Sequence, residues 1–265
     1  YQELEGSSLS GRVLEPEPFN SAHLGAHLRD LRLPLPEFAL FSDMMVARED
    51  LSHFQNVFRS IRSFGKVGAL LSRYAYQKIR WGRGVDLVLG NALAGRLYAS
   101  VLEAGITVRM GEQVSNLHRD GFGRVDGVEL LGGKTISARQ GVVLATGGFT
   151  GNLTLREKYL AQGMGDYSAT APGALGDGLY LAESAGGTFS QGRDGNAFLA
   201  PVSRYTRRDG SLAVFPHTVS DRAKPGLIAV DNRGERFVNE AVSYHEFGRA
   251  LLSHQNTSGP EEAFA

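Results

Sequence analysis

Residues 141–149, which read Gly-Val-Val-Leu-Ala-Thr-Gly-Gly-Phe, constrain the fold more than any other segment of the chain. A short run of apolar and β-branched residues without polar alternation is typical of a strand buried on both faces, as in parallel sheets. Two glycines at its carboxyl end allow a sharp turn and let another group approach the backbone. Taken alone, the segment favours a buried strand with a tight turn. Ligands of open α/β sheets bind at such strand ends, so a ligand-binding turn is the alternative.

A helix, a strand and a small antiparallel meander are expected before this segment. Apolar spacing predicts a helix over 91–104 that Gly105 ends, and a strand over 106–110 follows it. Glycine turns separate the three expected strands of the meander, at 114–119, 125–131 and 135–139. We expect the strands at 106–110 and 142–145 to lie in one sheet, so the predicted fold class is α/β, or α+β overall.

Helical spacing also appears on both sides of this central part. Apolar residues recur at intervals of three and four over 50–76, and this stripe is predicted to pack as a core face. Asp177 is a plausible N-cap for a short helix that starts at Gly178. The remaining expected elements are a helix at 153–160, strands at 227–230 and 236–239, and a helix at 244–252.

Composition excludes several classes of function. The chain of 265 residues has no cysteine, so it has neither disulfides nor thiolate metal sites, and we predict no metal centre. This fits a reducing compartment, and we expect a cytoplasmic location. Lys+Arg and Asp+Glu are both 28, so no basic field favours nucleic acid. No apolar run reaches the roughly 18 residues that span a bilayer. We therefore expect a small-molecule substrate as the partner.

Four segments of the chain, taken together and in order, form a pattern. The first segment, at 90–97, reads Gly-Asn-Ala-Leu-Ala-Gly-Arg-Leu, and the second is 142–149. The third, at 176–183, begins Gly-Asp-Gly. The fourth, at 234–240, reads Gly-Glu-Arg-Phe-Val-Asn-Glu and is followed by Ser243-Tyr244. Together they resemble the flavoprotein subunit family of fumarate reductase and succinate dehydrogenase, and within it the branch that contains 3-ketosteroid Δ1-dehydrogenase.

The resemblance implies a Rossmann-like FAD-binding domain with a small meander, followed by a capping or catalytic domain. We expect a partial FAD-binding domain over 1–204 and the start of the capping domain over 205–265. The family opens with a Gly-x-Gly-x-x-Gly turn that holds the FAD pyrophosphate, and this sequence contains no such turn. The family's Gly-rich C-terminal segment is also missing. We therefore expect an internal fragment of a longer flavoenzyme, one that binds FAD poorly or not at all on its own.

The resemblance also implies which residues hold FAD. Ala145, Thr146, Gly147 and Gly148 match the segment that passes the cofactor, and small residues suit a close approach of the backbone. Val114 resembles the position whose backbone pairs with the adenine edge. Asp177 either lies near the cofactor or caps its helix. An NAD-linked enzyme would need a second Gly-x-Gly-x-x-Gly turn, and none is visible.

The implied reaction is desaturation next to a carbonyl, in which the cofactor takes the hydride and the protein manages the proton. In the ketosteroid branch a tyrosine is the base, and Tyr244 stands at that position, four residues after Glu240. Fumarate reductases instead use an arginine with a Glu/Arg relay, and here Arg249 is the first arginine after Glu240. A tyrosine base needs a positive or dipolar neighbour, for which Arg236 and His245 are candidates.

Several alternatives remain open at this level. For Glu240 and Arg236 a structural ion pair competes with a catalytic role, and for Tyr244 simple packing does. The substrate could be a steroid or another enone or carboxylate. A fumarate reductase-like reduction, or a non-catalytic flavin-binding homologue, would also fit the same motifs.

Overall fold

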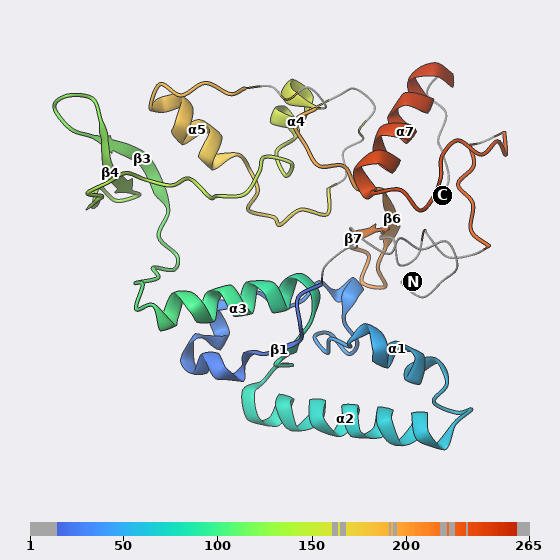
Figure 1. Ribbon diagram of the computed structural model, residues 1–265. Coiled ribbons are helices and arrows are strands. Elements are labelled where there is room, and N and C mark those ends of the chain that lie inside the picture. Colours follow the sequence, from blue (N-terminus) through green and yellow to red (C-terminus); the bar gives the residue numbers. More distant parts are fainter. Residues whose placement is uncertain are drawn as a thin grey trace. The chain divides into compact units, whose positions relative to one another are not determined.

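The computed structural model describes residues 15–160, 164, 168–190, 192, 195–217, 222, 226–231 and 233–258, with side chains up to residue 254. The chain forms two compact units, one of residues 8–111 and one of residues 112–265 with residues 1–7. Helices dominate the first unit, whereas the second combines small sheets with short helices (Figure 1). The boundary expected at 204/205 concerns family domains and stays a prediction.

The first unit is built from helices around one short pair of strands. Strands β1 (Phe19–Asn20) and β2 (Asp86–Leu87) pair antiparallel, with Phe19 opposite Leu87. The helical elements, in chain order, are η1 (Ser21–Asp30), η2 (Pro36–Phe38), α1 (Arg48–Gln55), α2 (Ile61–Trp81) and α3 (Leu89–Glu103). Leu24, Leu28 and Val85 form one buried cluster, and Met45, Leu87 and Ala92 form a second.

Local signals define the ends of the long helix α2. The Ser60 side chain accepts a hydrogen bond from the backbone N–H of Ser63, which is the arrangement of an N-cap. Gly82 ends the helix in the left-handed region with a φ of 74°. Gly105 follows α3 with a φ of 66°, so the helix ends where the sequence predicted. The helical spacing over 50–76 corresponds to two helices, separated at 56–60.

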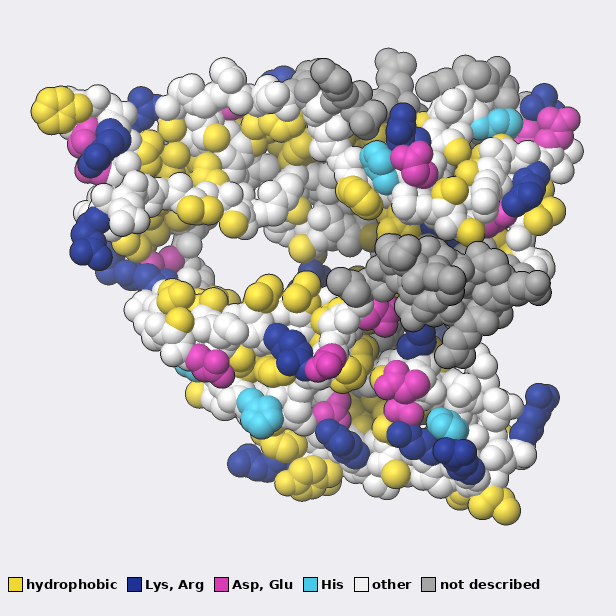
Figure 2. Space-filling view, in the orientation of Figure 1, with side chains coloured by type: hydrophobic (Ala, Val, Ile, Leu, Met, Phe, Trp, Pro, Cys, Tyr) yellow, Lys and Arg dark blue, Asp and Glu magenta, His cyan; other side chains and the backbone are white. Residues whose placement is uncertain are grey.

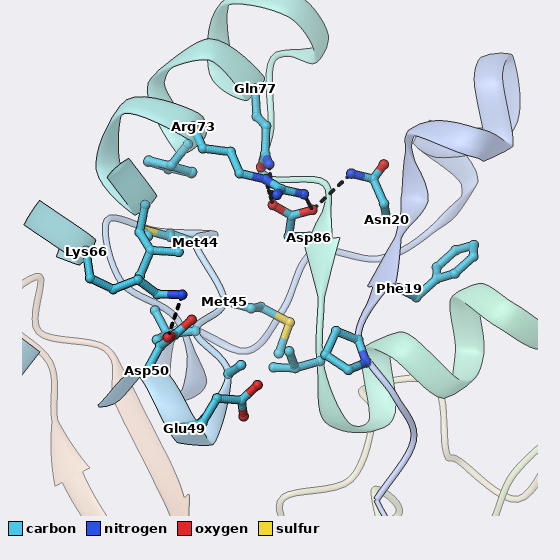
Figure 3. A pocket seen from close by; sticks show the side chains of 17 residues that line it. Phe19, Asn20, Met44, Met45, Glu49, Asp50, Lys66, Arg73, Gln77 and Asp86 are labelled. Carbon is cyan, nitrogen blue, oxygen red and sulfur yellow. Dashed lines mark hydrogen bonds and ion pairs between the residues drawn. The ribbon is translucent and has the colours of Figure 1, made fainter. Parts of the chain in front are cut away.

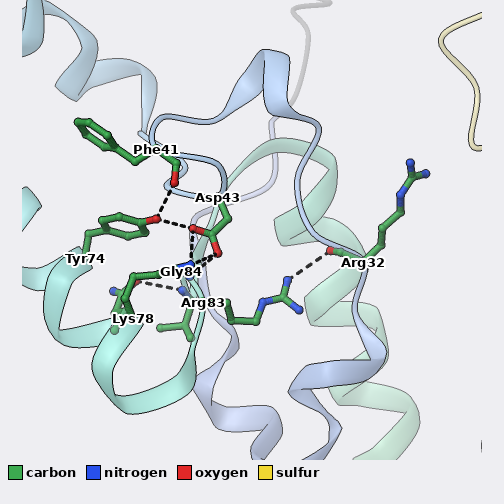
Figure 4. Close-up of polar contacts among 9 residues, drawn as sticks. Arg32, Phe41, Asp43, Tyr74, Lys78, Arg83 and Gly84 are labelled. Atoms are coloured by element: carbon green, nitrogen blue, oxygen red, sulfur yellow. Dashed lines mark hydrogen bonds and ion pairs between the residues drawn. The ribbon is translucent and has the colours of Figure 1, made fainter. Parts of the chain in front are cut away.

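A buried carboxylate fixes the C-terminal half of α2 (Figure 4). Asp43 accepts hydrogen bonds from the Tyr74 hydroxyl and from the Gly84 backbone N–H, and Lys78 lies 3.2 Å away. Burial alone would raise the pKa of Asp43, but these donors hold it below its ordinary value. Burial and the neighbouring carboxylate raise the pKa of Tyr74 to about 12. The clamp therefore joins the loop at 40–44 to α2.

The second unit begins with the meander that the sequence predicted. Strands β3 (Val114–Arg119), β4 (Val125–Leu130) and β5 (Thr135–Ser137) form an antiparallel sheet in the order β3-β4-β5. Gly127 allows the close approach of β5, because a Cβ there would lie 2.5 Å from the Ile136 carbonyl oxygen. The Arg119 guanidinium donates to the Ser184 carbonyl oxygen at 3.1 Å and so links β3 to the helix α5.

Short helices and one further hairpin complete the second unit. Helices α4 (Leu153–Tyr159) and α5 (Asp177–Ser184) occur close to their expected positions. Strands β6 (Val202–Thr206) and β7 (Leu212–Pro216) form a hairpin in a stretch that was expected to be only turn-rich. Helix α7 (Tyr244–Ser258) starts at the predicted residue.

The expected sheet of residues 106–110 and 142–145 does not form among the described residues. Residues 106–110 and 142–145 are not in strands, and no described strand pairs with either segment. Both segments carry exposed apolar side chains, with Ile106 57% and Val143 90% exposed. A strand buried on both faces requires hydrogen-bonding neighbours on its edges and packed layers on its faces, and the described residues supply neither. The observed fold is mixed, with helices and small antiparallel sheets.

Two smaller expectations also fail. Residues 227–230 and 236–239 meet only in one isolated bridge, between Val230 and Arg236, although the turn between them forms. Asp177 is the first residue of α5 rather than its N-cap. That position belongs to Gly176, which has a φ of 93° that a residue with a side chain rarely adopts.

Candidate functional site

Two glycine motifs that are about thirty residues apart in sequence meet in the second unit. The Gly148 carbonyl oxygen accepts a hydrogen bond from the Gly176 backbone N–H at 3.2 Å, and the Gly151 N–H donates to the Ala174 carbonyl oxygen at 2.9 Å. The Asn152 side chain adds a hydrogen bond to the Leu175 carbonyl oxygen at 3.1 Å. The turn after residue 145 is therefore fixed against the start of α5.

The absence of side chains makes this contact possible. A Cβ at Gly178 would overlap the Thr146 hydroxyl oxygen, and one at Gly176 would overlap the Leu155 side chain. Gly147 has a φ of 82°, in the left-handed region that favours glycine. At Gly148 a Cβ would meet no atom within 4 Å. The backbone of 147–148 is therefore open to another molecule, as a close-fitting cofactor requires.

The structure brings some of the predicted cofactor residues together. Thr146, Gly147, Gly148 and Asp177 lie at the junction of the turn and α5, and Asp177 is exposed in the first turn of that helix. Anions are favoured at a helix N-terminus, so Asp177 suits its position without any hydrogen bond from its side chain. Val114 belongs instead to β3, where it pairs in register with Leu130.

The predicted catalytic pair Glu240 and Arg236 forms a bidentate ion pair. The Arg236 Nη2–Glu240 Oε2 distance is 2.6 Å and the Nε–Oε1 distance is 3.0 Å. Glu240 also accepts the Ala229 backbone N–H at 2.8 Å. The Arg236 guanidinium and the Ala229 N–H lower the pKa of Glu240 from 4.5 to about 2, although burial opposes the shift. Glu240 is therefore held as a carboxylate.

Tyr244 is half-buried at the start of α7 and lies against a cation that the sequence did not indicate. The Arg222 guanidinium is 5.5 Å from the centroid of the Tyr244 ring. Arg222 is only 2% exposed, and it donates to the carbonyl oxygens of Glu240 and Val242. The charge is therefore positioned by the backbone that immediately precedes Tyr244. The two neighbours of Tyr244 that the sequence suggested have other contacts. Arg236 pairs with Glu240, and the His245 ring stacks on Phe198.

A cavity of about 460 Å³ lies beside the glycine turn and α7. Thr150 and Arg156 line its side near the turn, and Gly248 and Leu251 line its side on α7. Most other lining side chains are apolar, and this size lies within the usual range for small-molecule sites. Tyr244 does not line this cavity, although it precedes Gly248 by four residues and so lies on the same face of α7.

Arg156 is a residue that sequence reasoning missed. It is 8% exposed, and its guanidinium donates to the carbonyl oxygens of Thr150 and Met164. Its position one turn after Asn152, which caps α4, was a usable signal. A buried cation at this position ties the glycine turn to the cavity wall.

The first unit has its own cavity of about 360 Å³, which sequence reasoning also missed (Figure 3). Arg73, Gln77 and Asn20 converge on Asp86, and Lys66 lies 3.0 Å from Asp50. These charges are already paired with one another across the cavity. The arrangement joins α1, α2 and the β1–β2 pair, so these contacts stabilise the unit.

The cofactor motif has clear relatives among known proteins. The sequence profile of the family described as "FAD binding domain" matches residues 2–264. A 4-oxocyclohex-2-ene-1-carboxylate 5-dehydrogenase from Sinomonas cyclohexanicum is 33% identical over 100% of this chain and 45% of its own length. A 3-oxosteroid 1-dehydrogenase from Mycolicibacterium smegmatis is 30% identical over 98% of this chain and 45% of its own length.

A solved structure supports the same relationship. The 3-ketosteroid Δ1-dehydrogenase of Sterolibacterium denitrificans, in complex with 1,4-androstadiene-3,17-dione, matches with a TM-score of 0.72 and 29% identity. The match covers 98% of this chain and 47% of that one. A fumarate reductase (cytochrome) from Shewanella frigidimarina is 30% identical over 61% of this chain and 27% of its own length. The chain thus spans about half the length of the dehydrogenases that it matches.

Proposed function

Since this chain belongs to the FAD-binding domain family, we propose that it forms part of an oxidoreductase that desaturates a cyclic ketone next to its carbonyl group. FAD is the cofactor of that family. Apart from the fumarate reductase, the relatives named above are dehydrogenases of ring ketones, one of a small cyclohexene carboxylate and others of steroids. A cyclic ketone is therefore the proposed substrate class, with an apolar ring and one polar carbonyl.

The observation that carries this proposal is the open glycine turn held against the start of α5. Gly147 and Gly148 present backbone without side chains, and the open space at Gly148 leaves room for a planar ring. We assign Ala145, Thr146, Gly147 and Gly148 as the seat of the cofactor, with Asp177 beside it and Val114 toward the adenine. When bound there, FAD supplies the hydride acceptor.

We assign Tyr244 as the proton acceptor at its phenol oxygen. The Arg222 guanidinium faces the ring of Tyr244, and the phenol is at the N-terminus of α7, where the backbone dipole favours an anion. The Arg236–Glu240 ion pair acts as a positioning element for the segment that precedes Tyr244. The cavity beside α7, lined mostly by apolar side chains, accommodates the ring of the ketone.

The proposal also includes a Rossmann-like sheet and a domain boundary at 204/205. A Rossmann-like arrangement requires residues 106–110 and 142–145 to enter a common sheet in the complete protein that contains this sequence. The domain boundary at 204/205 would then separate cofactor binding from substrate binding. The reverse reaction, reduction of an enone as in fumarate reductases, uses the same cofactor seat and is the alternative.

The test uses the complete protein, purified with its flavin. A 3-oxosteroid and a 4-oxocyclohexane carboxylate are added separately without oxygen, and loss of the visible flavin absorbance reports desaturation. Tyr244→Phe should keep its FAD content and lose turnover by at least about 10²-fold. Tyr180→Phe, which changes an exposed tyrosine of α5, should match the parent. A Tyr244→Phe loss below about threefold would show that Tyr244 is a packing residue.

A further inference from the structure

Helix α2 has an outer face that is apolar yet exposed. Ile61 is 93% exposed, Phe64 63%, Tyr76 59% and Ile79 86%, and Phe58 just before the helix is 94% exposed. At about 100° per residue, the four helical positions fall within roughly one third of the circumference. The predicted core stripe was therefore only partly correct, because Phe58 and Ile61 face outward rather than into the unit.

The rest of this face carries no charge. Gly65, Gly68, Ser72 and Ala75 are exposed, and they lie between the apolar residues at the two ends of the helix. Single exposed apolar side chains are ordinary in soluble proteins. Four large apolar side chains along one uncharged strip of a helix are not ordinary, and such patches mark interaction surfaces.

The unpaired charges beside this strip are basic. Residues 51–85 contain no Asp or Glu, and they contain Arg59, Arg62, Lys66, Arg73, Lys78, Arg80 and Arg83. Lys66, Arg73 and Lys78 are paired with carboxylates of the same unit, and Arg83 is buried. Arg62 and Arg80 are exposed, and both lie on the same side of the helix, about 100° from the centre of the strip. Figure 2 shows hydrophobic and basic side chains along the edge formed by α2.

We propose that the outer face of α2 lies in the surface of a membrane that contains anionic lipids. An amphipathic helix with basic flanks and bulky apolar side chains is suited to the boundary between headgroups and acyl chains. Arg62 and Arg80 would reach the headgroups while their stems cover apolar surface. Within the described residues no helix is long and apolar enough to cross a membrane, so the contact is parallel to the surface.

Charge favours a membrane over a second copy of this chain. In a two-fold symmetric dimer the same patch meets itself, so Arg62 and Arg80 of one copy would face a strip that carries no acidic side chain. An anionic headgroup layer instead supplies the opposite charge along the whole helix. The proposal rests on α2 alone and is independent of the proposed enzymatic function.

Vesicle sedimentation of the complete protein tests this proposal. The protein should bind vesicles of phosphatidylcholine with phosphatidylglycerol more strongly than phosphatidylcholine alone, and added salt should weaken this preference. The triple change Ile61→Gln, Phe64→Gln and Ile79→Gln should lower the bound fraction by at least about tenfold. The double change Arg62→Gln and Arg80→Gln should remove the preference for the anionic lipid.

Two control variants carry matched changes in the other unit. Phe122→Gln alters an equally exposed aromatic at a turn of the meander, and Lys134→Gln with Arg139→Gln removes two exposed cations. Both should bind as the parent does, and thermal melting should confirm that every variant folds. Absence of vesicle binding by the complete protein would overturn the proposal. So would equal binding by the α2 triple variant, or a dimer in solution that this variant dissociates.

Discussion

In the unit of residues 8–111, the buried Asp43 carboxylate accepts hydrogen bonds from Tyr74 of α2 and from the Gly84 backbone, and it pairs with Lys78 of α2. In the unit of residues 112–258, the turn at 146–149 is held by main-chain hydrogen bonds and by glycines that leave space. The first arrangement fixes elements by satisfying a buried charge. The second keeps backbone accessible, which is what a bound cofactor needs. A buried ion pair thus fixes the first unit, whereas the proposed cofactor seat lies in the second.

The largest expected effect comes from breaking the Asp43 clamp. Asp43→Ala leaves Lys78 without its partner and the buried Gly84 N–H without an acceptor, so it should lower the free energy of unfolding by about 3–5 kcal/mol. Asp50→Ala removes a more exposed ion pair with Lys66 and should cost at most ~1 kcal/mol. Urea unfolding measures both variants. Equal losses would mean that Asp43 does not clamp α2.

The next effect comes from filling the space in the glycine junction. Gly178→Ala places a methyl group against the Thr146 hydroxyl oxygen and should cost about 1–3 kcal/mol. Thr146→Ala removes that oxygen, so the double variant should recover most of the loss. A double-mutant cycle by thermal melting measures the coupling between the two sites. Additive losses would show that the two residues do not touch.

The Glu240–Arg236 pair should make stability depend on pH. Because the pKa of Glu240 falls from 4.5 to about 2 on folding, its stabilisation is complete above pH 4.5 and is lost as the pH falls toward 2. Glu240→Gln should lower the free energy of unfolding by about 1–2 kcal/mol at neutral pH and flatten this dependence. Urea midpoints across that pH range give the measurement. An unchanged slope in the variant would assign the acid sensitivity to other carboxylates.

Asp177 should have the smallest effect on stability. It is exposed and makes no capping hydrogen bond, so Asp177→Asn should remove only the attraction of its charge to the α5 dipole, about 0.3–1 kcal/mol. If Asp177 also lies beside the cofactor, FAD affinity should fall while the melting temperature barely moves. Flavin titration of the two proteins separates a helix role from a cofactor role.

Local signals predicted local structure well. Gly105 ends α3, alternation with glycine turns gives the meander, and Tyr244 starts α7, because each depends on neighbouring residues. The hairpin at 202–216 was missed although its Asp209-Gly210 turn was visible in the sequence. The sequence predicted a buried strand at 142–145. Such a strand needs neighbouring strands and covering layers, and the residues of the segment itself do not show whether these are present.

The candidate site was predicted in part, for the same reason. The glycine motifs are local, and they indicated the turn and the start of α5 that the structure joins. Arg222 and Arg156 were missed because each acts through backbone carbonyls contributed by other segments. Such contacts depend on the tertiary fold, and no spacing of residues in the sequence predicts them.

The central claim is that the open backbone at 147–148 is the seat of FAD, and flavin content of Gly148→Leu tests it most directly. A Cβ at Gly148 would meet no protein atom within 4 Å, and the position needs no left-handed backbone, so the variant should fold and melt as the parent does. Gly121→Leu, in a turn of the meander that meets the same two conditions, is the control. In the complete protein, Gly148→Leu should lose its flavin while Gly121→Leu keeps it. Stoichiometric FAD in a folded Gly148→Leu protein would contradict the account.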